Sequence, residues 1–385
     1  MSAKLDPELW EQNYAAMIRG LDADQRREVY AGLTPGVHRI QAGAGSGKTV
    51  VMVAMAAMAI NERNYNPSGI AMLTFTNAAA AEMWQRLLPV IRPDARAYMA
   101  KEGVLTFDKF IYRGVMRNQR LRATIGLNGP KCRGSRDRGS DRMLLQDMMW
   151  YVKHIATQPP LIRTGDRRGQ REPMDGLPNS FSGLKLFRRE DGTPLEAFEL
   201  DADAYKRLRA VVAIRDRVRA DGLRFDRNDE FQAAVKLATD LCEDIDLSFE
   251  DFFKPIVIRI EEVKRVKGAW ESIDVADGYM RYGTDRRSLV AIDETQDNNR
   301  MQTKIGVRLI RETGGSVNLV GDPAQSIFWF RGASPETLQG LVTEYGATPG
   351  ILANNYRSCQ LIVEAGNLIA EGQVWAMDAP ARPIR

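Results

Sequence analysis

Short strand-like segments that end at polar residues recur along this chain. Three of them predict strands of a sheet, because each is only four or five residues long and ends at a turn or at charged side chains. They are VHRIQ at 37–41, IAMLT at 70–74 and LVAI at 289–292. The last run is apolar throughout, which is typical of a parallel strand buried on both faces. A fourth run, Val317 to Val320, directly precedes the sequence GDPAQSIFWFRGA.

Apolar residues at helical spacing occur between and beyond these runs. A short helix is predicted over 20–30, a strongly apolar one over 50–60, and another in the segment that follows Asn77. The segments 201–221 and 228–244 also carry apolar residues at helical spacing, with charged faces between them. We expect those charged faces to be solvated rather than to bind a nucleic acid.

The composition is that of a globular protein with room for more than one domain. The chain has 385 residues, of which 44% are hydrophobic, enough for two or three domains. Its longest nearly continuous apolar run, Val50 to Ile60, is about half of the roughly 20 residues that a membrane helix needs. The first residues lack a signal-peptide pattern. No membrane association is expected, and the cytoplasm is the expected compartment.

The cysteine and histidine content and the net charge limit which metal sites, disulfides and partners the sequence favours. Three cysteines without a CxxC pair and only two histidines argue against a disulfide framework, a zinc site or an iron–sulfur site. Any metal should therefore be held by oxygen ligands. The net charge of +4 does not by itself indicate a nucleic-acid partner. Basic residues nevertheless gather between Arg117 and Arg142, in a segment that is either a solvated loop or a contact for phosphates.

The sequence AGAGSGKT at 42–49 is the clearest single motif. Its glycines let the backbone turn tightly and point successive N–H groups inward, which suits phosphate oxygens at the start of a helix. The motif is a P-loop, in which Lys48 is expected to reach the β- and γ-phosphates and Thr49 to bind Mg²⁺ through its hydroxyl. The predicted nucleotide-binding residues are Ala42, Gly43, Ala44, Gly45, Ser46, Gly47, Lys48 and Thr49. Ala42 stands where the general pattern has glycine.

A second acidic site is expected at DETQD, residues 293–297, where the apolar run 289–292 ends. Asp293 is predicted to hold Mg²⁺, directly or through water, and Glu294 to polarise the attacking water. An apolar strand that ends in Asp-Glu is common by itself. Its pairing with a P-loop favours an ATP-hydrolysing site over a surface carboxylate pair.

Two smaller segments carry side chains that packing alone does not explain. Gln25 lies in the predicted helix over 20–30, and its amide can both donate to and accept from an adenine edge. The alternative interpretation of Gln25 is an exposed helical glutamine. Phe75 follows the run at 70–74 and lies at the mouth of the predicted sheet, flanked by Thr74 and Thr76.

Taken in order, these motifs resemble those of the superfamily 1 DNA helicases of the UvrD and Rep type. Gln25 fits the Q motif, and an ordered series of motifs is far more specific than any one of them. The other matches are AGAGSGKT (motif I), TFTNAAAAEM at 74–83 (motif Ia), LTFDKF at 105–110 (the TFHSF segment), DETQD (motif II), GDPAQSIFWFRGA at 321–333 (motif III) and NNYRS at 354–358 (motif IV). The resemblance covers nearly the whole chain except residues 111–272.

The resemblance implies roles for the remaining site residues. On the nucleotide side, Gln325 senses the γ-phosphate, Tyr356 lies near the adenine and Arg357 meets the transition-state charge. The implied single-stranded DNA path is formed by Phe75, Asn77, Phe328, Trp329, Phe330 and Arg331. Aromatic rings stack on any base, so such a path binds without sequence preference. The alternative for individual rings is an aromatic plug that closes the sheet edge.

Three features depart from the family pattern. Val50 replaces the arginine that often follows GKT, and Trp329 stands where a glycine is usual, so either Trp329 or Phe330 is the candidate stacking ring. The chain also stops at Arg385, before the family's motifs V and VI. We therefore expect the 385 residues alone to bind ATP but to hydrolyse it slowly, unless a C-terminal half or a partner subunit supplies those motifs.

The implied architecture is an α/β fold built on a RecA-like P-loop NTPase domain. Its doubly wound, mainly parallel sheet should carry the nucleotide at the C-terminal ends of the strands. Residues 1–110 and 273–345 are expected to form this motor domain, 1A, and residues 111–272 a mostly helical inserted subdomain of 1B type. Residues 346–385 are expected to begin an incomplete second RecA-like domain, 2A.

The implied function is that of a UvrD-type, ATP-dependent DNA helicase or translocase. ATP and Mg²⁺ would be the cofactors, single-stranded DNA or a duplex with a single-stranded tail the substrate, and 3′ to 5′ the direction of movement. The alternative is a non-motor, nucleotide-gated DNA-binding module or subunit that needs a partner chain. Both interpretations share every motif, so the sequence does not separate them.

Overall fold

A computed structural model describes residues 9–124, 202–225, 228–254, 256–258, 272–326, 335–371 and 380–384 of the chain. Residue contacts divide the chain into two compact units, which we call unit 1 (Met1–Leu121 with Ala276–Arg385) and unit 2 (Arg122–Val275). All of the matched motifs lie in unit 1. No helix in the described part of the chain is long and apolar enough to cross a membrane.

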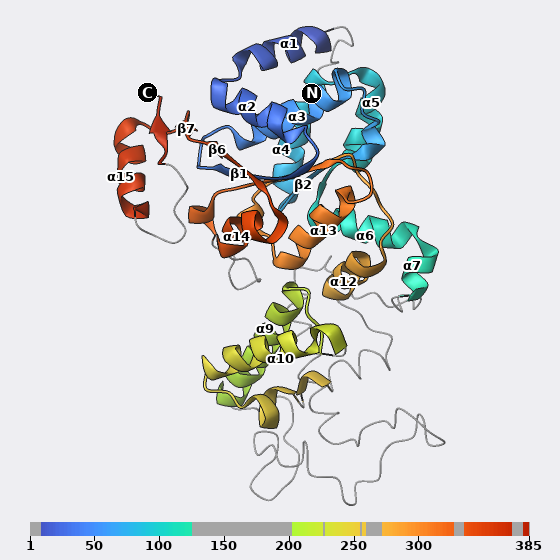
Figure 1. The fold of residues 1–385 in the computed structure, drawn as a ribbon, viewed down its shortest axis with the longest axis vertical. Helices are drawn as coiled ribbons and strands as arrows, with labels where there is room; N and C mark the ends of the chain where they lie inside the picture. The colour runs from blue at the N-terminus through green and yellow to red at the C-terminus, as the bar shows by residue number, and fades with distance from the viewer. Residues whose placement is uncertain are drawn as a thin grey trace, which may run out of the picture. The chain divides into compact units, whose positions relative to one another are not determined.

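A six-stranded sheet with the order β3-β2-β4-β5-β1-β6 forms the centre of unit 1 (Figure 1). Every neighbouring pair is parallel, so the C-terminal ends of the strands meet at one edge. Strands β2, β4 and β5 are buried along their whole length, as their apolar sequences predict. The strands are β1 (Gly36–Ala42), β2 (Ile70–Thr74), β3 (Val104–Thr106), β4 (Leu289–Ile292), β5 (Ser316–Gly321) and β6 (Thr348–Leu352).

Helices lie on both faces of this sheet, which confirms the predicted α/β class (Figure 1). One face carries α2 (Ala23–Gly32), α3 (Lys48–Asn61), α4 (Asn77–Leu87) and α5 (Pro93–Tyr98), with α1 (Trp10–Gly20) packed on α3. The other face carries α6 (Phe107–Arg117), α13 (Arg300–Ile310) and α14 (Pro335–Tyr345). Helix α15 (Gln360–Ala370) also belongs to unit 1, whereas the unit boundaries fall within α7 (Gln119–Thr124) and α12 (Ser272–Tyr282).

Helix α3 is the centre of the core. Its residues Val51 to Ile60 are all buried, because the helix is enclosed between the sheet and helices α1, α2 and α4. A helix that is apolar on every side needs such a position. The helix begins at Lys48, directly after Gly47, so the first turn of the most buried helix is also the end of the P-loop.

Strand β6 corrects the predicted boundary at residue 346. It pairs in parallel with β1 and forms an edge of the first sheet, whereas residues 346–385 were expected to lie outside that sheet. Its sequence TPGIL is half exposed and contains proline and glycine, so it lacks the apolar run that revealed the other strands. After β6, the two-residue strand β7 (Asn354–Asn355) pairs with β8 (Arg382–Pro383) in a separate small sheet. The wider division into domains 1A, 1B and 2A stays a prediction.

Unit 2 is helical where the structure describes it. Helices α9 (Ala202–Ala220) and α10 (Asn228–Glu243) are present where helical spacing predicted them, and they pack through a shared apolar cluster. A π-helical turn at Phe249–Phe253 closes that cluster, with the rings of Phe249 and Phe253 stacked. Most of the basic segment 117–142 lies outside the described residues.

Candidate functional site

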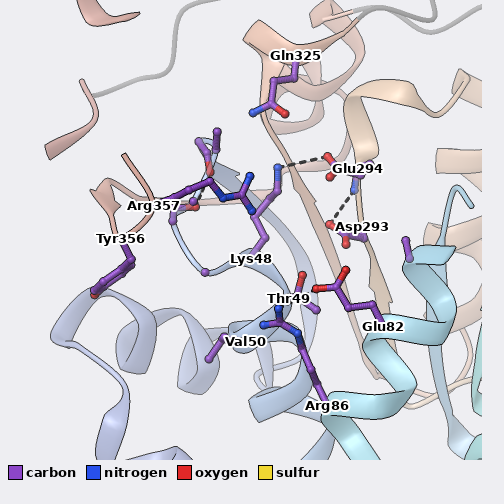
Figure 2. Close-up of a pocket in the computed structure, with 16 residues that line it drawn as sticks. Lys48, Thr49, Val50, Glu82, Arg86, Asp293, Glu294, Gln325, Tyr356 and Arg357 are labelled. Atoms are coloured by element: carbon purple, nitrogen blue, oxygen red, sulfur yellow. Dashed lines mark hydrogen bonds and ion pairs between the residues drawn. The ribbon is translucent and has the colours of Figure 1, made fainter. Parts of the chain in front are cut away.

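One pocket of unit 1 lies at the edge of the sheet where the strands end (Figure 2). Its volume is about 370 Å³. Its walls come from the loop after β1, helix α4, the residues after β4 and β5, and the residues after β7. Ligands of open α/β sheets bind outside the C-terminal ends of the strands, so this pocket is the candidate site.

The P-loop forms the floor of the pocket. Gly45 and Gly47 have φ angles of +71° and +87°, which glycine adopts without strain. Each also lies close to a neighbour: a Cβ on Gly45 would come within 2.5 Å of the Arg357 side chain, and one on Gly47 within 2.5 Å of the Gln25 amide. The loop leads into the N-terminus of α3, where unpaired N–H groups and the helix dipole favour an anion.

The predicted phosphate-binding residues are almost all at this floor. The seven residues Gly43 to Thr49 line the pocket, whereas Ala42 is fully buried at the end of β1 behind the loop. The Ser46 hydroxyl donates to the Gly43 carbonyl at 2.8 Å, which holds the loop in its turn. The structure therefore gives Ala42 a place in the core rather than on the pocket surface.

The acidic pair after β4 faces the P-loop. The Lys48 ammonium lies 3.3 Å from Oε2 of Glu294, so these two predicted catalytic side chains form an ion pair across the pocket. Glu294 has a φ angle of +49°, an unusual conformation for a residue with a side chain, and its backbone N–H donates to Asp293 Oδ1 at 2.9 Å. Such backbone strain costs of order 1–3 kcal/mol and is found mostly at functional sites.

Asp293 is a buried carboxylate in the wall of the pocket. It is only 5% exposed, and burial, together with the neighbouring Glu294 charge, raises the pKa of Asp293 to about 6. Thr49 lines the same pocket, so a hydroxyl and a carboxylate are available to a hard cation such as Mg²⁺. The described residues contain no group of three or more acidic, histidine or cysteine side chains able to hold a metal.

Gln325 reaches the pocket from the turn after β5. It ends the 3-10 turn η8 (Pro323–Gln325), and its amide Nε2 donates to Asp322 Oδ2 at 2.6 Å. Asp322 in turn caps this short turn, because its Oδ1 accepts from the N–H of Ala324 at 3.0 Å. The Gln325 side chain is therefore held in place while it lines the pocket (Figure 2).

Tyr356 and Arg357 close the pocket from the segment after β7. Figure 2 shows the Arg357 side chain directed into the pocket beside Lys48. The hydroxyl of Tyr356 donates to the carboxylate of Asp22, and burial and this bond raise the pKa of Tyr356 to about 12. Asn354 also donates to Asp22 Oδ2, at 2.8 Å. A carboxylate at the start of α2 thus anchors the residue expected near the adenine.

Gln25 is buried, so the alternative interpretation of an exposed helical glutamine is wrong. Gln25 is 6% exposed, its Nε2 donates to the Ser46 carbonyl at 3.3 Å, and its Oε1 accepts from the Asp22 N–H in a capping box. It does not line the pocket, so both ends of the amide brace α2 and the P-loop. Its predicted contact with adenine stays a prediction.

Two charged pocket residues on α4 were not found from the sequence. Glu82 and Arg86 both line the pocket and form an ion pair of 2.7 Å, and Figure 2 shows them beside Thr49 and Val50. The only signal in the sequence was an acidic and a basic residue four positions apart on a helix, which ordinarily describes a surface pair. Arg86 brings a cation next to Val50, the position where the family pattern often has arginine.

The predicted DNA-contacting residues are only partly described. Phe75 is half-buried after β2, and Asn77 is exposed at the first position of α4. Both lie at the edge of the sheet where the strands end. The other four, Phe328, Trp329, Phe330 and Arg331, lie outside the described residues.

Comparison with known proteins agrees with the order of the motifs. The family model for the UvrD/REP helicase N-terminal domain matches residues 21–159 and 222–346. The chain is 30% identical over 364 residues to the ATP-dependent DNA helicase UvrD1 of Mycobacterium tuberculosis, covering 92% of this chain and 39% of that protein. It is 27% identical over 359 residues to DNA helicase II of Haemophilus influenzae, covering 91% and 40%. It is 27% identical over 352 residues to the ATP-dependent DNA helicase PcrA of Bacillus subtilis, covering 91% of this chain and 39% of that protein. The chain thus spans about two fifths of the length of these relatives.

Proposed function

The chain belongs to the UvrD/REP helicase N-terminal domain family, and on that basis we propose that it is the ATP-hydrolysing part of a UvrD-type DNA helicase or translocase. The observation that carries the proposal is the meeting of four separate motifs in one pocket. Lys48, Glu294, Gln325 and Arg357 come from the ends of β1, β4, β5 and β7, and all four line it. The catalytic and binding roles of these residues are part of the same proposal.

Phosphate binding would begin with an exchange of partners at Lys48. The Lys48 ammonium is paired with Glu294 at 3.3 Å. A triphosphate bound to the N–H groups of the P-loop offers Lys48 more negative charge than one carboxylate does. Lys48 would then leave Glu294, and the released carboxylate would be available to accept a proton from water.

Mg²⁺ held by Thr49 and Asp293 would neutralise phosphate charge and orient the oxygens. Arg357, directed into the pocket beside Lys48, would meet the charge that develops on the γ-phosphoryl oxygens. Gln325 would contact the same phosphate from the opposite wall, and Tyr356 would lie against the base. The substrate proposed for the motor is single-stranded DNA, or a duplex with a single-stranded tail, with movement from 3′ to 5′.

The test is ATP hydrolysis by the chain with and without an oligonucleotide. We expect Mg²⁺-dependent hydrolysis that single-stranded DNA stimulates, and a loss of about 10²-fold or more in Lys48→Ala, because that change removes a charge that meets the developing phosphate charge. Lys48→Ala should keep the thermal midpoint of the parent, since the residue lies at the surface of the core. Chelation of Mg²⁺ should abolish the activity of the parent.

The second candidate, a nucleotide-gated DNA-binding module, predicts a different result. The parent would bind nucleotide and oligonucleotide, with affinities that depend on each other, yet would hydrolyse ATP no faster than Lys48→Ala. Nucleotide binding of equal strength by the parent and Lys48→Ala would refute the P-loop assignment, and with it both candidates.

A further inference from the structure

Gln296 lies directly behind the pocket, in the 3-10 turn η7 (Thr295–Asp297) that follows the acidic pair. Its side chain is 1% exposed. A buried amide must find partners for both its N–H₂ donor and its carbonyl acceptor, and it can satisfy them only in one orientation. The two partners of the Gln296 amide therefore identify the groups that this turn holds in place.

The donor end of the Gln296 amide faces Glu294, the predicted general base. Its Nε2 donates to Oε2 of Glu294 at 2.7 Å, and the Lys48 ammonium approaches the same oxygen at 3.3 Å. Within the described part of the chain, Oε1 of Glu294 has no hydrogen-bond partner. The amide thus fixes the carboxylate through one oxygen and leaves the other available to water, and this bond does not depend on Lys48.

The acceptor end of Gln296 faces the end of β5. Its Oε1 accepts a hydrogen bond from the backbone N–H of Asp322 at 3.0 Å. The backbone carbonyl of Gln296 accepts a hydrogen bond from the Ser326 hydroxyl at 3.1 Å. The approach is close: a Cβ on Gly321 would lie 2.4 Å from Oε1 of Gln296. Glycine at this position is what allows the turn to touch the strand end.

The same contacts continue to the opposite wall of the pocket. Asp322, whose N–H is bound by Gln296, accepts from Gln325 Nε2 at 2.6 Å through its carboxylate. Glu294 and Gln325 both line the pocket. A continuous series of hydrogen bonds therefore runs from Glu294 through Gln296 and Asp322 to Gln325.

We propose that Gln296 is a positioning residue for ATP hydrolysis, which orients the Glu294 carboxylate and ties that orientation to Gln325. The inference rests on the proposed function. In the reaction, the water oxygen forms a bond to the γ-phosphorus while the bridging P–O bond to the β-phosphate breaks. The electron pair of that bond leaves on ADP, and the water proton passes to Glu294. Gln296 itself does not line the pocket, so its part in this step would be to hold Glu294.

The test compares Gln296→Met, which keeps the length of the side chain and removes both hydrogen bonds, with the parent chain. In single-turnover hydrolysis with enzyme in excess, we expect the rate to fall about 10- to 100-fold, a part of the 10²–10⁴-fold that a positioned base contributes. The affinity for Mg²⁺-ATP should stay within about twofold, because Gln296 does not itself line the pocket. Gln302→Met is the matched control: Gln302 caps α13 through its amide, does not touch Glu294, and should keep the parent rate.

A double-mutant cycle separates positioning from a general loss of structure. If Gln296 acts through Glu294, then Gln296→Met should lower the residual rate of Glu294→Gln by less than about twofold, since coupled residues are not additive. A full, multiplicative loss in that background would overturn the inference. A parent chain that hydrolyses ATP while Gln296→Met equals it would overturn the inference alone, whereas a parent without hydrolysis would overturn the proposed function as well.

Gln296→Glu keeps the inference testable should Gln296→Met fail to fold. It preserves size and an acceptor for the Asp322 N–H, but places a second carboxylate oxygen against Glu294 where the donor was. We expect a loss of rate at least as large as in Gln296→Met, because the donor is lost and the two carboxylates repel each other. A Gln296→Glu protein with the parent rate would contradict the role given to Gln296.

Discussion

Arg86 shows how an ordinary surface residue can belong to a site. Its side chain is 48% exposed and paired with Glu82, an arrangement that contributes about 0–1 kcal/mol to folding at most. Yet both residues line the pocket, beside Thr49 and Val50. The Arg86 cation adds to the positive potential that a bound polyphosphate would meet. It does so beside Val50, where the family pattern often has an arginine and this chain has an uncharged side chain.

At the scale of this residue, we expect Arg86→Gln to weaken Mg²⁺-ATP binding by roughly fivefold, about 1 kcal/mol, because a half-exposed cation contributes modestly. The thermal midpoint should not change. Arg300→Gln is the matched control, since Arg300 has the same 48% exposure and an ion pair of 2.9 Å with Glu344, outside the pocket. Isothermal titration of the parent, Arg86→Gln and Arg300→Gln with Mg²⁺-ATP measures this difference. Equal affinities of all three proteins would show that Arg86 does not contribute to nucleotide binding.

Helix α2 joins three parts of the nucleotide site. Its capping residue Asp22 binds Tyr356 and Asn354, while Gln25 braces the P-loop. Two residues further on, the Arg27 guanidinium donates to the carbonyl of Ile351 on β6 at 3.3 Å. Side chains of α2 therefore hold an edge strand of the sheet as well as the tyrosine expected near the base.

At the scale of this element, Asp22→Ala should destabilise the protein by about 1 kcal/mol through loss of the helix cap. It should also weaken ATP binding, because Tyr356 loses its anchor. Asn299→Ala is the control: Asn299 caps α13 with the same kind of capping box but does not touch the pocket. Denaturant unfolding and nucleotide titration together test this. Loss of ATP affinity in both variants would assign the effect to general destabilisation.

On the scale of the whole molecule, helix α15 presents an unusual surface. Leu361, Ile362, Leu368 and Ile369 are between 63% and 77% exposed, whereas Val363 of the same helix is buried. Several large apolar side chains exposed on one short helix are typical of an interaction surface or of a site of aggregation. They contribute little to the stability of unit 1, because they are not packed.

We therefore expect the double change Leu361→Gln and Leu368→Gln to leave the free energy of unfolding within about 0.5 kcal/mol of the parent. Self-association at rising protein concentration should decrease, as sedimentation velocity would show. As a control, Val363→Gln on the buried side of the same helix should lower stability clearly. A double variant that associates as strongly as the parent would show that this face of α15 is not responsible.

The sequence by itself determined the family, the parallel sheet and the main members of the site. Its signals are local: Gly45 and Gly47 have the positive φ angles that the P-loop requires, and the buried strands β2, β4 and β5 are short apolar runs. Local backbone requirements of this kind are visible in a few consecutive residues. The order of the motifs along the chain then indicated which strand ends meet at the pocket.

Only the tertiary structure decided the contacts between distant segments. Asp22 and Tyr356 are 334 positions apart, and the hydrogen bond from Asp322 to Gln296 crosses 26 positions. Neither partner has a sequence pattern that reveals the other, because a carboxylate or an amide at the end of a strand can face many neighbours. Strand β6 was missed for a related reason: it is an edge strand, held by β1 and α2 rather than by an apolar sequence of its own. Parallel strands bring their C-terminal ends together from far along the chain, so the partners at that edge are set by strand order in space.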